Sequence, residues 1–235
     1  MLTANGVSCY AARVAARTLN EIESKALLAA AGVPVTPTML AASADDAATV
    51  AYRLGYPVAL KIVSPDIVHK SDIGGVRLGL DDARAVRAAF DAIVAAARAA
   101  RPEARIDGVA VQPMAPPDGL ELVVGASLDP QFGQVVMCGL GGIWVEVLQD
   151  VSFRLAPLTA RDARQMWTDL TGAAVLRGVR GAPAVALPAL EALLLRVSAL
   201  VTARPDIREL DLNPVLAYPD GVVAVDARVL LEVDP

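Results

Sequence analysis

The chain has 235 residues, 55% of them hydrophobic, which is enough for one large domain or two small lobes with a substantial core. A net charge of -5 and 4% aromatic residues argue against nucleic-acid binding. Charge or proline interrupts the most apolar stretches before the ~18 to 20 residues that a membrane span needs, so the cytoplasm is the expected compartment. Two cysteines and one histidine make a disulfide framework or a zinc site unexpected.

Helical periodicity with capping residues alternates along the chain with short β-branched or alternating runs. In chain order, these patterns predict helices over residues 20–32 and 43–55, strands over 56–63 and 74–80, a helix over 81–100, strands over 107–114, 119–129 and 132–142, helices over 159–170 and 188–205, and strands over 208–218 and 221–231. Helices interleaved with strands, and a final antiparallel hairpin, indicate an α+β fold in two lobes.

The final hairpin gathers oxygen-bearing side chains. Alternation sends Glu209, Asp211 and Asn213 to one face of the strand, and pairing across the turn at 219–221 brings Asp226 near them. The carboxylates on such a face repel one another unless a cation binds between them, and Mg²⁺ is a suitable cation because it prefers oxygen ligands such as carboxylates and amides. A solvated outer strand face is the alternative interpretation.

Lys61 lies inside a predicted strand, in a chain with only three lysines. A lysine at such a position either reaches water from an edge strand or points into a cleft towards an anion. The "GLGG" segment at 139–142 follows an apolar strand, and its glycines would let backbone N–H groups approach a phosphate, although such a segment is more often a simple turn. Together with a magnesium site, these features fit the handling of nucleotide phosphates.

The segment "HKSDIGG" at 69–75 holds the only histidine of the chain. A lone histidine is usually structural or merely exposed. A neutral imidazole is also a competent nucleophile towards phosphorus, and this one follows the predicted phosphate-binding lysine by eight residues. Lys70 and the backbone amides of Gly74 and Gly75 could stabilise a phosphoryl group on His69, and Asp72, next to Ser71, could orient the ring.

Several segments resemble the nucleotide-binding part of the NDP-forming acyl-CoA synthetases, of the ADP-forming acetate–CoA ligase type. They are "EIESKALLAAAGVPVTP", "GYPVALKIVSPDIVHKSDIGGV", "VQPM", "ELVVGASLDPQFGQVVMCGLGGIWVEVLQDVSFRLAPL", "RELDLNPV" and "VDARV". They occur in order from about Asn20 to the end of the chain, and the histidine segment is highly specific for this family. The family is similar to succinyl-CoA synthetase β chains.

The resemblance implies an ATP-grasp fold whose two lobes clasp ATP or ADP with Mg²⁺. We expect an N-terminal extension at 1–19, a lobe with the His69 loop at 20–110, and a lobe with the glycine loop and the magnesium site at 111–235. The resemblance assigns the phosphoryl relay to His69, aided by its loop residues Lys70, Ser71, Asp72, Gly74 and Gly75. It assigns nucleotide binding to Lys61, to the adenine-side hinge Val111, Gln112, Pro113 and Met114, to Glu121, and to Gly139, Gly141 and Gly142. It assigns magnesium to Asn213 and Asp226, with Asp211 nearby.

The CoA-binding portion of this family, which carries a second phosphorylated histidine, is missing from the sequence. We therefore expect an α-type partner subunit or domain that binds CoA and the acyl substrate, and no nucleic-acid or membrane partner. The implied reaction is acyl-CoA + ADP + phosphate to acid + CoA + ATP. Two alternatives stay open: an ATP-grasp carboxylate ligase that works through an acyl phosphate without phosphohistidine, and a non-catalytic nucleotide-sensing module.

Overall fold

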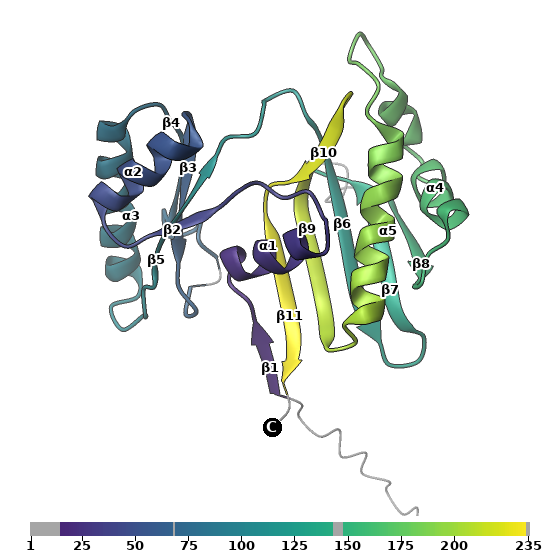
Figure 1. Ribbon diagram of the computed structural model, residues 1–235, viewed down its shortest axis with the longest axis horizontal. Coiled ribbons are helices and arrows are strands. Elements are labelled where there is room, and N and C mark those ends of the chain that lie inside the picture. The colour runs from purple at the N-terminus through teal and green to yellow at the C-terminus, as the bar shows by residue number, and fades with distance from the viewer. Residues whose placement is uncertain (1–14, 68, 143–147, 234–235) are drawn as a thin grey trace, which may run out of the picture.

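The computed structural model describes residues 15–67, 69–142 and 148–233, whose strands form two antiparallel sheets in separate lobes (Figure 1). The elements, in chain order, are β1 (Ala15–Thr18), α1 (Glu21–Ala30), β2 (Met39–Ala41), α2 (Ala44–Leu54), β3 (Val58–Val63), β4 (Val76–Leu80), α3 (Ala83–Ala100), β5 (Gly108–Pro113), β6 (Leu120–Asp129), β7 (Gly133–Leu140), β8 (Val151–Leu155), α4 (Ala160–Thr168), the 3₁₀ helix η2 (Ala173–Arg177), α5 (Leu187–Ala203), β9 (Ile207–Tyr218), β10 (Gly221–Ala224) and β11 (Ala227–Val233).

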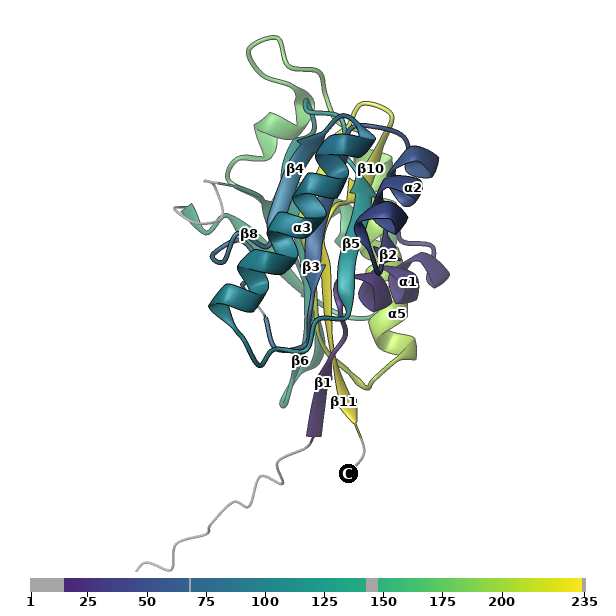
Figure 2. The ribbon, with the colours of Figure 1, turned by 90° about the vertical axis from the view of Figure 1, so that its left-hand side faces the viewer.

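The small lobe is a four-stranded sheet in the order β2-β5-β3-β4. Helices α2 and α3 lie side by side against it (Figures 1 and 2). Ser43 and Asp82 cap these helices by accepting hydrogen bonds from the backbone N–H groups of Asp46 and Ala85. The apolar faces of both helices bury residues such as Ile93 against the strands, which makes one continuous core. This core fixes β3, the strand that carries Lys61.

The large lobe has the strand order β1-β11-β9-β6-β7-β8, with β10 paired to β9. Helices α1, α4 and α5 contribute Leu28, Trp167 and Leu194, among others, to a single core with the strands. On β9, Leu210 and Leu212 point into this core, whereas Asp211 and Asn213 are exposed. The sheet therefore turns one apolar face towards the helices and leaves polar side chains on the other.

Each predicted helix and strand has a counterpart, but the strand predicted over 221–231 is two strands, β10 and β11, interrupted at residues 225 and 226. The hairpin pairing of β9 with β10 across the 219–221 turn is confirmed, with Gly221 opposite Tyr218. Sequence patterns missed the short strands β1, β2 and β8. The expected division at residues 110 and 111 falls within β5, which belongs to the small sheet. The expected N-terminal extension includes β1, which pairs with β11, while residues 1–14 lie outside the described part.

The segment after α1 joins the two lobes. The Thr36 N–H donates to the Ala224 carbonyl at 3.0 Å, and the Ala224 N–H donates to the Pro34 carbonyl at 2.9 Å. These contacts place the start of the small lobe beside the β10–β11 connection of the large lobe. Within the described ranges, every helix is too short or too polar to cross a membrane.

Candidate functional site

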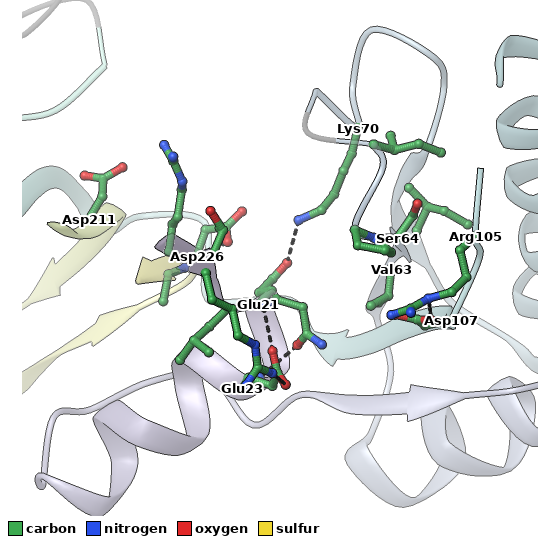
Figure 3. A pocket seen from close by; sticks show the side chains of 18 of the residues that line it. Glu21, Glu23, Val63, Ser64, Lys70, Arg105, Asp107, Asp211 and Asp226 are labelled. Atoms are coloured by element: carbon green, nitrogen blue, oxygen red, sulfur yellow. Dashed lines mark hydrogen bonds and ion pairs between the residues drawn. The ribbon is translucent and has the colours of Figure 1, made fainter. Parts of the chain in front are cut away.

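A pocket of about 660 Å³ lies between the lobes (Figure 3). The small lobe contributes the end of β3 and the histidine loop, and the large lobe contributes the β1–α1 connection, β9 and β11. Its polar lining residues are Arg17, Thr18, Asn20, Glu21, Glu23, Ser64, Lys70, Arg105, Asp107, Asp211, Asn213, Asp226 and Arg228. Four of these, Lys70, Asp211, Asn213 and Asp226, were predicted site residues.

Lys61 extends from the small lobe to the large one. Strand β3 lies between β5 and β4, so Lys61 is not on an edge strand, and its side chain is only 9% exposed. Its Nζ donates to Glu21 Oε1 at 2.8 Å and to Asp226 Oδ2 at 3.1 Å. Burial by itself would lower the pKa of Lys61, but the two carboxylates outweigh it and raise the pKa. Lys61 is therefore a full cation at neutral pH.

Glu21 is the centre of this charge cluster. It is the first residue of α1, where Asn20 and Glu23 form a capping box. Its side chain, 2% exposed, accepts hydrogen bonds from all three lysines of the chain: Lys61 as above, Lys25 on Oε1 at 2.9 Å, and Lys70 on Oε2 at 3.4 Å. Burial would raise the pKa of Glu21, but Lys61, Lys25 and Lys70 together lower it to about 2.

Lys25 has the most buried side chain of the three lysines. Besides Glu21, its Nζ donates to Gln112 Oε1 at 2.7 Å and lies 2.8 Å and 2.9 Å from the hydroxyl oxygens of Thr36 and Thr38. An ammonium has three hydrogens for these four oxygens, so every hydrogen finds a partner. Burial lowers the pKa of Lys25, with Glu21 acting against it. Lys25 thus links α1 to β5 and fixes the Glu21 carboxylate.

The predicted magnesium ligands lie around the same pocket. Asp211 and Asn213 are alternate residues of β9, and Asp226 lies between β10 and β11. Although the Asp211 side chain is exposed by surface area, the surrounding pocket wall partly desolvates its carboxylate and raises the pKa of Asp211, while Arg228, opposite it on β11, works in the other direction. Among the residues that the structure describes, no group of three or more His, Cys, Asp or Glu side chains is arranged to hold a metal ion by itself. Two carboxylates and an amide fit instead an ion that fills its shell with phosphate oxygens and water, as Mg²⁺ usually does.

The histidine loop approaches this cluster through Lys70 (Figure 3). His69 is exposed and is not among the residues that line the pocket. The loop closes on itself, because the N–H of Gly75 donates to the Lys70 carbonyl at 2.7 Å and that of Gly74 donates to the Ser71 carbonyl at 3.1 Å. At Gly75 a Cβ atom would lie 2.7 Å from Ile62 Cγ2 and 2.8 Å from the Lys70 oxygen, so only glycine fits without a shift.

Neither Lys61 nor the other predicted nucleotide residues line this pocket. Val111 is buried in the core of the small lobe, the Gln112 side chain is bound to Lys25, and Met114 is more exposed. The Gly141 N–H donates to the Glu121 carbonyl at 2.8 Å, and a Cβ on Gly142 would lie 3.0 Å from Glu121 Oε2. Glu121, Gly141 and Gly142 are thus neighbours at the ends of β6 and β7. Their role, and that of Pro113 and Gly139, stays a prediction.

Sequence patterns did not identify Glu21 as a site residue. An acidic residue in the first turn of a helix is ordinarily explained by the helix dipole. Two signals were present: Glu21 and Lys25 have the i,i+4 spacing of an ion pair, and lysine is rare in this chain. Neither signal reveals that Lys61 and Lys70 meet the same carboxylate.

Comparison with known proteins supports one family along nearly the whole chain. A model of the ATP-grasp domain family matches residues 10–231. The β subunit of ADP-forming acetate–CoA ligase I from Pyrococcus furiosus is 44% identical over 215 residues, which cover 92% of each chain. ADP-forming acetate–CoA ligase I from Archaeoglobus fulgidus is 46% identical over 209 residues, 89% of this chain but 30% of that protein. The chain thus spans nearly all of one relative and about a third of the other.

Among solved structures, the dinucleotide forming acetyl-coenzyme A synthetase 1 of Ca. Korarchaeum cryptofilum is similar in two states. The complex with coenzyme A, Ca-AMPCP and HgCl⁺ has a TM-score of 0.89 and 44% identity, covering 92% of this chain and 93% of that one. The complex with coenzyme A and Mg-AMPPCP, whose phosphohistidine segment points towards the nucleotide binding site, has a TM-score of 0.81 and 42% identity, covering 91% and 92%. With the fold, the family model and the P. furiosus subunit in agreement, the chain belongs to the ATP-grasp family and is similar to the β subunits of the ADP-forming acetate–CoA ligases.

Proposed function

We propose that this chain is the nucleotide-binding, phosphoryl-transferring component of an ADP-forming acyl-CoA synthetase, with His69 as the relay. The reversible reaction is acyl-CoA + ADP + phosphate to acid + CoA + ATP. One observation carries the proposal: the pocket between the lobes is lined by Asn213, Asp226, Glu21 and Lys70, the residue after His69, and two of these carboxylates, Glu21 and Asp226, bind the Lys61 ammonium. The phosphohistidine segment of the K. cryptofilum enzyme supports the role of His69.

The chemistry on this chain begins with a neutral imidazole. A ring nitrogen of His69 attacks the γ-phosphorus of ATP, an N–P bond forms, and the bond to the bridging oxygen breaks, so that ADP leaves with the electron pair. Lys61, held protonated by Glu21 and Asp226, supplies a fixed positive charge for the phosphates. Asn213 and Asp226, with Asp211 nearby, would hold Mg²⁺, which neutralises phosphate charge when bound.

A partner is required for the acyl half of this reaction. The β-subunit relative implies an α subunit, and the A. fulgidus relative is a single longer chain. We propose that the α-type partner carries a second histidine and binds CoA and the acyl substrate. It would then form the acyl phosphate. We also propose a cytoplasmic location, where ADP, ATP and CoA are all available.

Isotope exchange between ATP and ADP tests the proposal with this chain alone. If His69 takes the γ-phosphoryl group reversibly, magnesium, ATP and labelled ADP will yield labelled ATP without any acid or CoA. His69→Ala should abolish this exchange while ATP binding, measured by calorimetry, is retained. Arg87→Met, which breaks an exposed ion pair with Asp45 on the small lobe, is the matched control and should exchange as the unaltered chain does.

The two alternatives give other results. A carboxylate ligase that forms an acyl phosphate directly would show exchange only when its carboxylate substrate is added, and His69→Ala would exchange normally. A sensing module would bind ATP and show no exchange under either condition. Either pattern would contradict the proposed relay.

A further inference from the structure

The histidine loop, defined here as residues 69–75, is tied to the opposite lobe through Lys70. The strands that flank it, β3 and β4, belong to the small sheet. Lys70 Nζ lies 3.4 Å from Oε2 of Glu21, and α1, which begins at Glu21, packs in the core of the large lobe through Leu28. Because His69 directly precedes Lys70, the position of the Lys70 head group limits where the imidazole can reach.

Backbone hydrogen bonds close the histidine loop on itself and hold its C-terminal end on β3. The Gly75 N–H bonds the Lys70 carbonyl at 2.7 Å, and the Ile62 N–H bonds the Gly75 carbonyl at 2.8 Å, which fixes the C-terminal end of the loop to β3. Ser71 and Asp72, at the tip, are exposed. The Lys70 side chain therefore restrains the His69 end of the loop from the large lobe.

The ion pair between Lys70 and Glu21 can break at little electrostatic cost. Glu21 Oε1 accepts hydrogen bonds from Lys25 and Lys61, and Oε2 accepts one from Lys70, which is the longest of the three. With Asp226, the cluster has two carboxylates and three ammonium groups, so the departure of Lys70 leaves the charges balanced. The Lys70 side chain is 25% exposed, so water can replace Glu21 as its partner. Opening therefore isolates no buried charge.

We propose that Glu21 and Lys70 form a latch that seats the histidine loop at the nucleotide side, and that opening the latch frees His69 to carry its phosphoryl group to the partner. Glu21 and Lys70 are positioning residues in this scheme, which rests on the proposed function. Lys25 and Lys61 hold the Glu21 carboxylate in place whether the latch is open or closed.

Hydrogen exchange of the Gly74 and Gly75 amides, in the full chain without nucleotide, tests the latch. Lys70→Met should exchange these amides about fivefold faster, as expected for losing ~1 kcal/mol of ion-pair stabilisation, and Lys70→Arg should restore slow exchange. Glu21→Gln should also speed the exchange, and if this variant does not fold, Lys70→Met decides alone. Arg87→Met is the control and should leave both amides unchanged.

A second readout separates the latch from a general loss of structure. With ATP saturating, Lys70→Met should form phosphohistidine several times more slowly, and Lys70→Arg should recover the rate. Unchanged amide exchange in Lys70→Met would overturn the latch. If phosphorylation slowed nonetheless, Lys70 would be acting on the phosphoryl group directly. Because the exchange is measured without nucleotide, it decides the latch even if His69 is never phosphorylated, a result that would instead contradict the proposed function.

Discussion

Glu21 is a single buried carboxylate that holds three lysine side chains of the site, Lys25, Lys61 and Lys70. Breaking a buried ion pair by removing one partner typically costs about 3 to 5 kcal/mol, because a charge is left uncompensated. Here two buried lysines, Lys25 and Lys61, depend on the same carboxylate. The sequence predicted the importance of Lys61 from its place in a strand. It could not predict Glu21, because the contact joins residues 40 positions apart on different lobes.

The acid stability of the protein should report on Glu21. Its pKa is lowered from 4.5 to about 2, so its stabilising contribution is complete above pH 4.5 and is lost as the pH falls towards 2. A difference of that size corresponds to roughly 3 kcal/mol. The gap in unfolding free energy between the unaltered chain and Glu21→Gln should therefore close by about this amount between pH 6 and pH 2, measured by urea denaturation at each pH.

Glu103→Gln is the matched control for this measurement, since Glu103 is an exposed glutamate beyond the end of α3. The difference in unfolding free energy between Glu103→Gln and the unaltered chain should stay near zero between pH 6 and pH 2. A Glu21→Gln gap that does not change with pH would show that the lysines do not stabilise the ionised Glu21 in the folded protein.

At the scale of elements, local patterns predicted most of the architecture. Period-two alternation on β9 placed Asp211 and Asn213 on one face, and capping residues marked where α1 and α2 begin. The missed strands β1, β2 and β8 have three to five residues, too few for a pattern. Strands β1 and β2 form by pairing with strands distant in the sequence, β11 and β5, whereas β8 pairs with the preceding strand β7. The geometry of the histidine loop was only partly predictable: its glycines suggested a turn, and the contact of Gly75 with Ile62 depends on the fold.

Gly75→Ala should disturb the turn that carries His69. The added methyl group would lie within 3 Å of Ile62 Cγ2 and the Lys70 carbonyl oxygen, in a packed core. Overpacking of this kind costs about 1 to 3 kcal/mol, which should lower the melting temperature by several degrees, and displacement of the turn should slow phosphorylation of His69. Thermal denaturation and ATP–ADP exchange measure the two effects.

Gly221→Ala provides the comparison, because a Cβ at Gly221 meets no atom within 4 Å. This variant should keep both the melting temperature and the exchange rate. If Gly75→Ala matched Gly221→Ala in both measurements, the turn would have room that the structure does not show.

At the scale of the whole molecule, the two lobes assemble a site that neither holds alone. The small lobe supplies Lys61 and the histidine loop, and the large lobe supplies Glu21, Asn213 and Asp226. Sequence patterns predicted two lobes and most of these residues, and the family resemblance supplied their roles. How the lobes face one another depends on long-range contacts such as Thr36 with Ala224, which leave no local signal.

Direct labelling is the most direct test of whether His69 takes the γ-phosphoryl group of ATP. The purified chain is incubated with magnesium and γ-labelled ATP, and any protein-bound label is tested for stability in acid and in alkali, with His69→Ala alongside. If His69 is the relay, the protein acquires label that acid removes and that alkali leaves in place, and His69→Ala acquires none. Label of the same stability on His69→Ala, or no label on a chain shown to bind ATP, would contradict this role of His69.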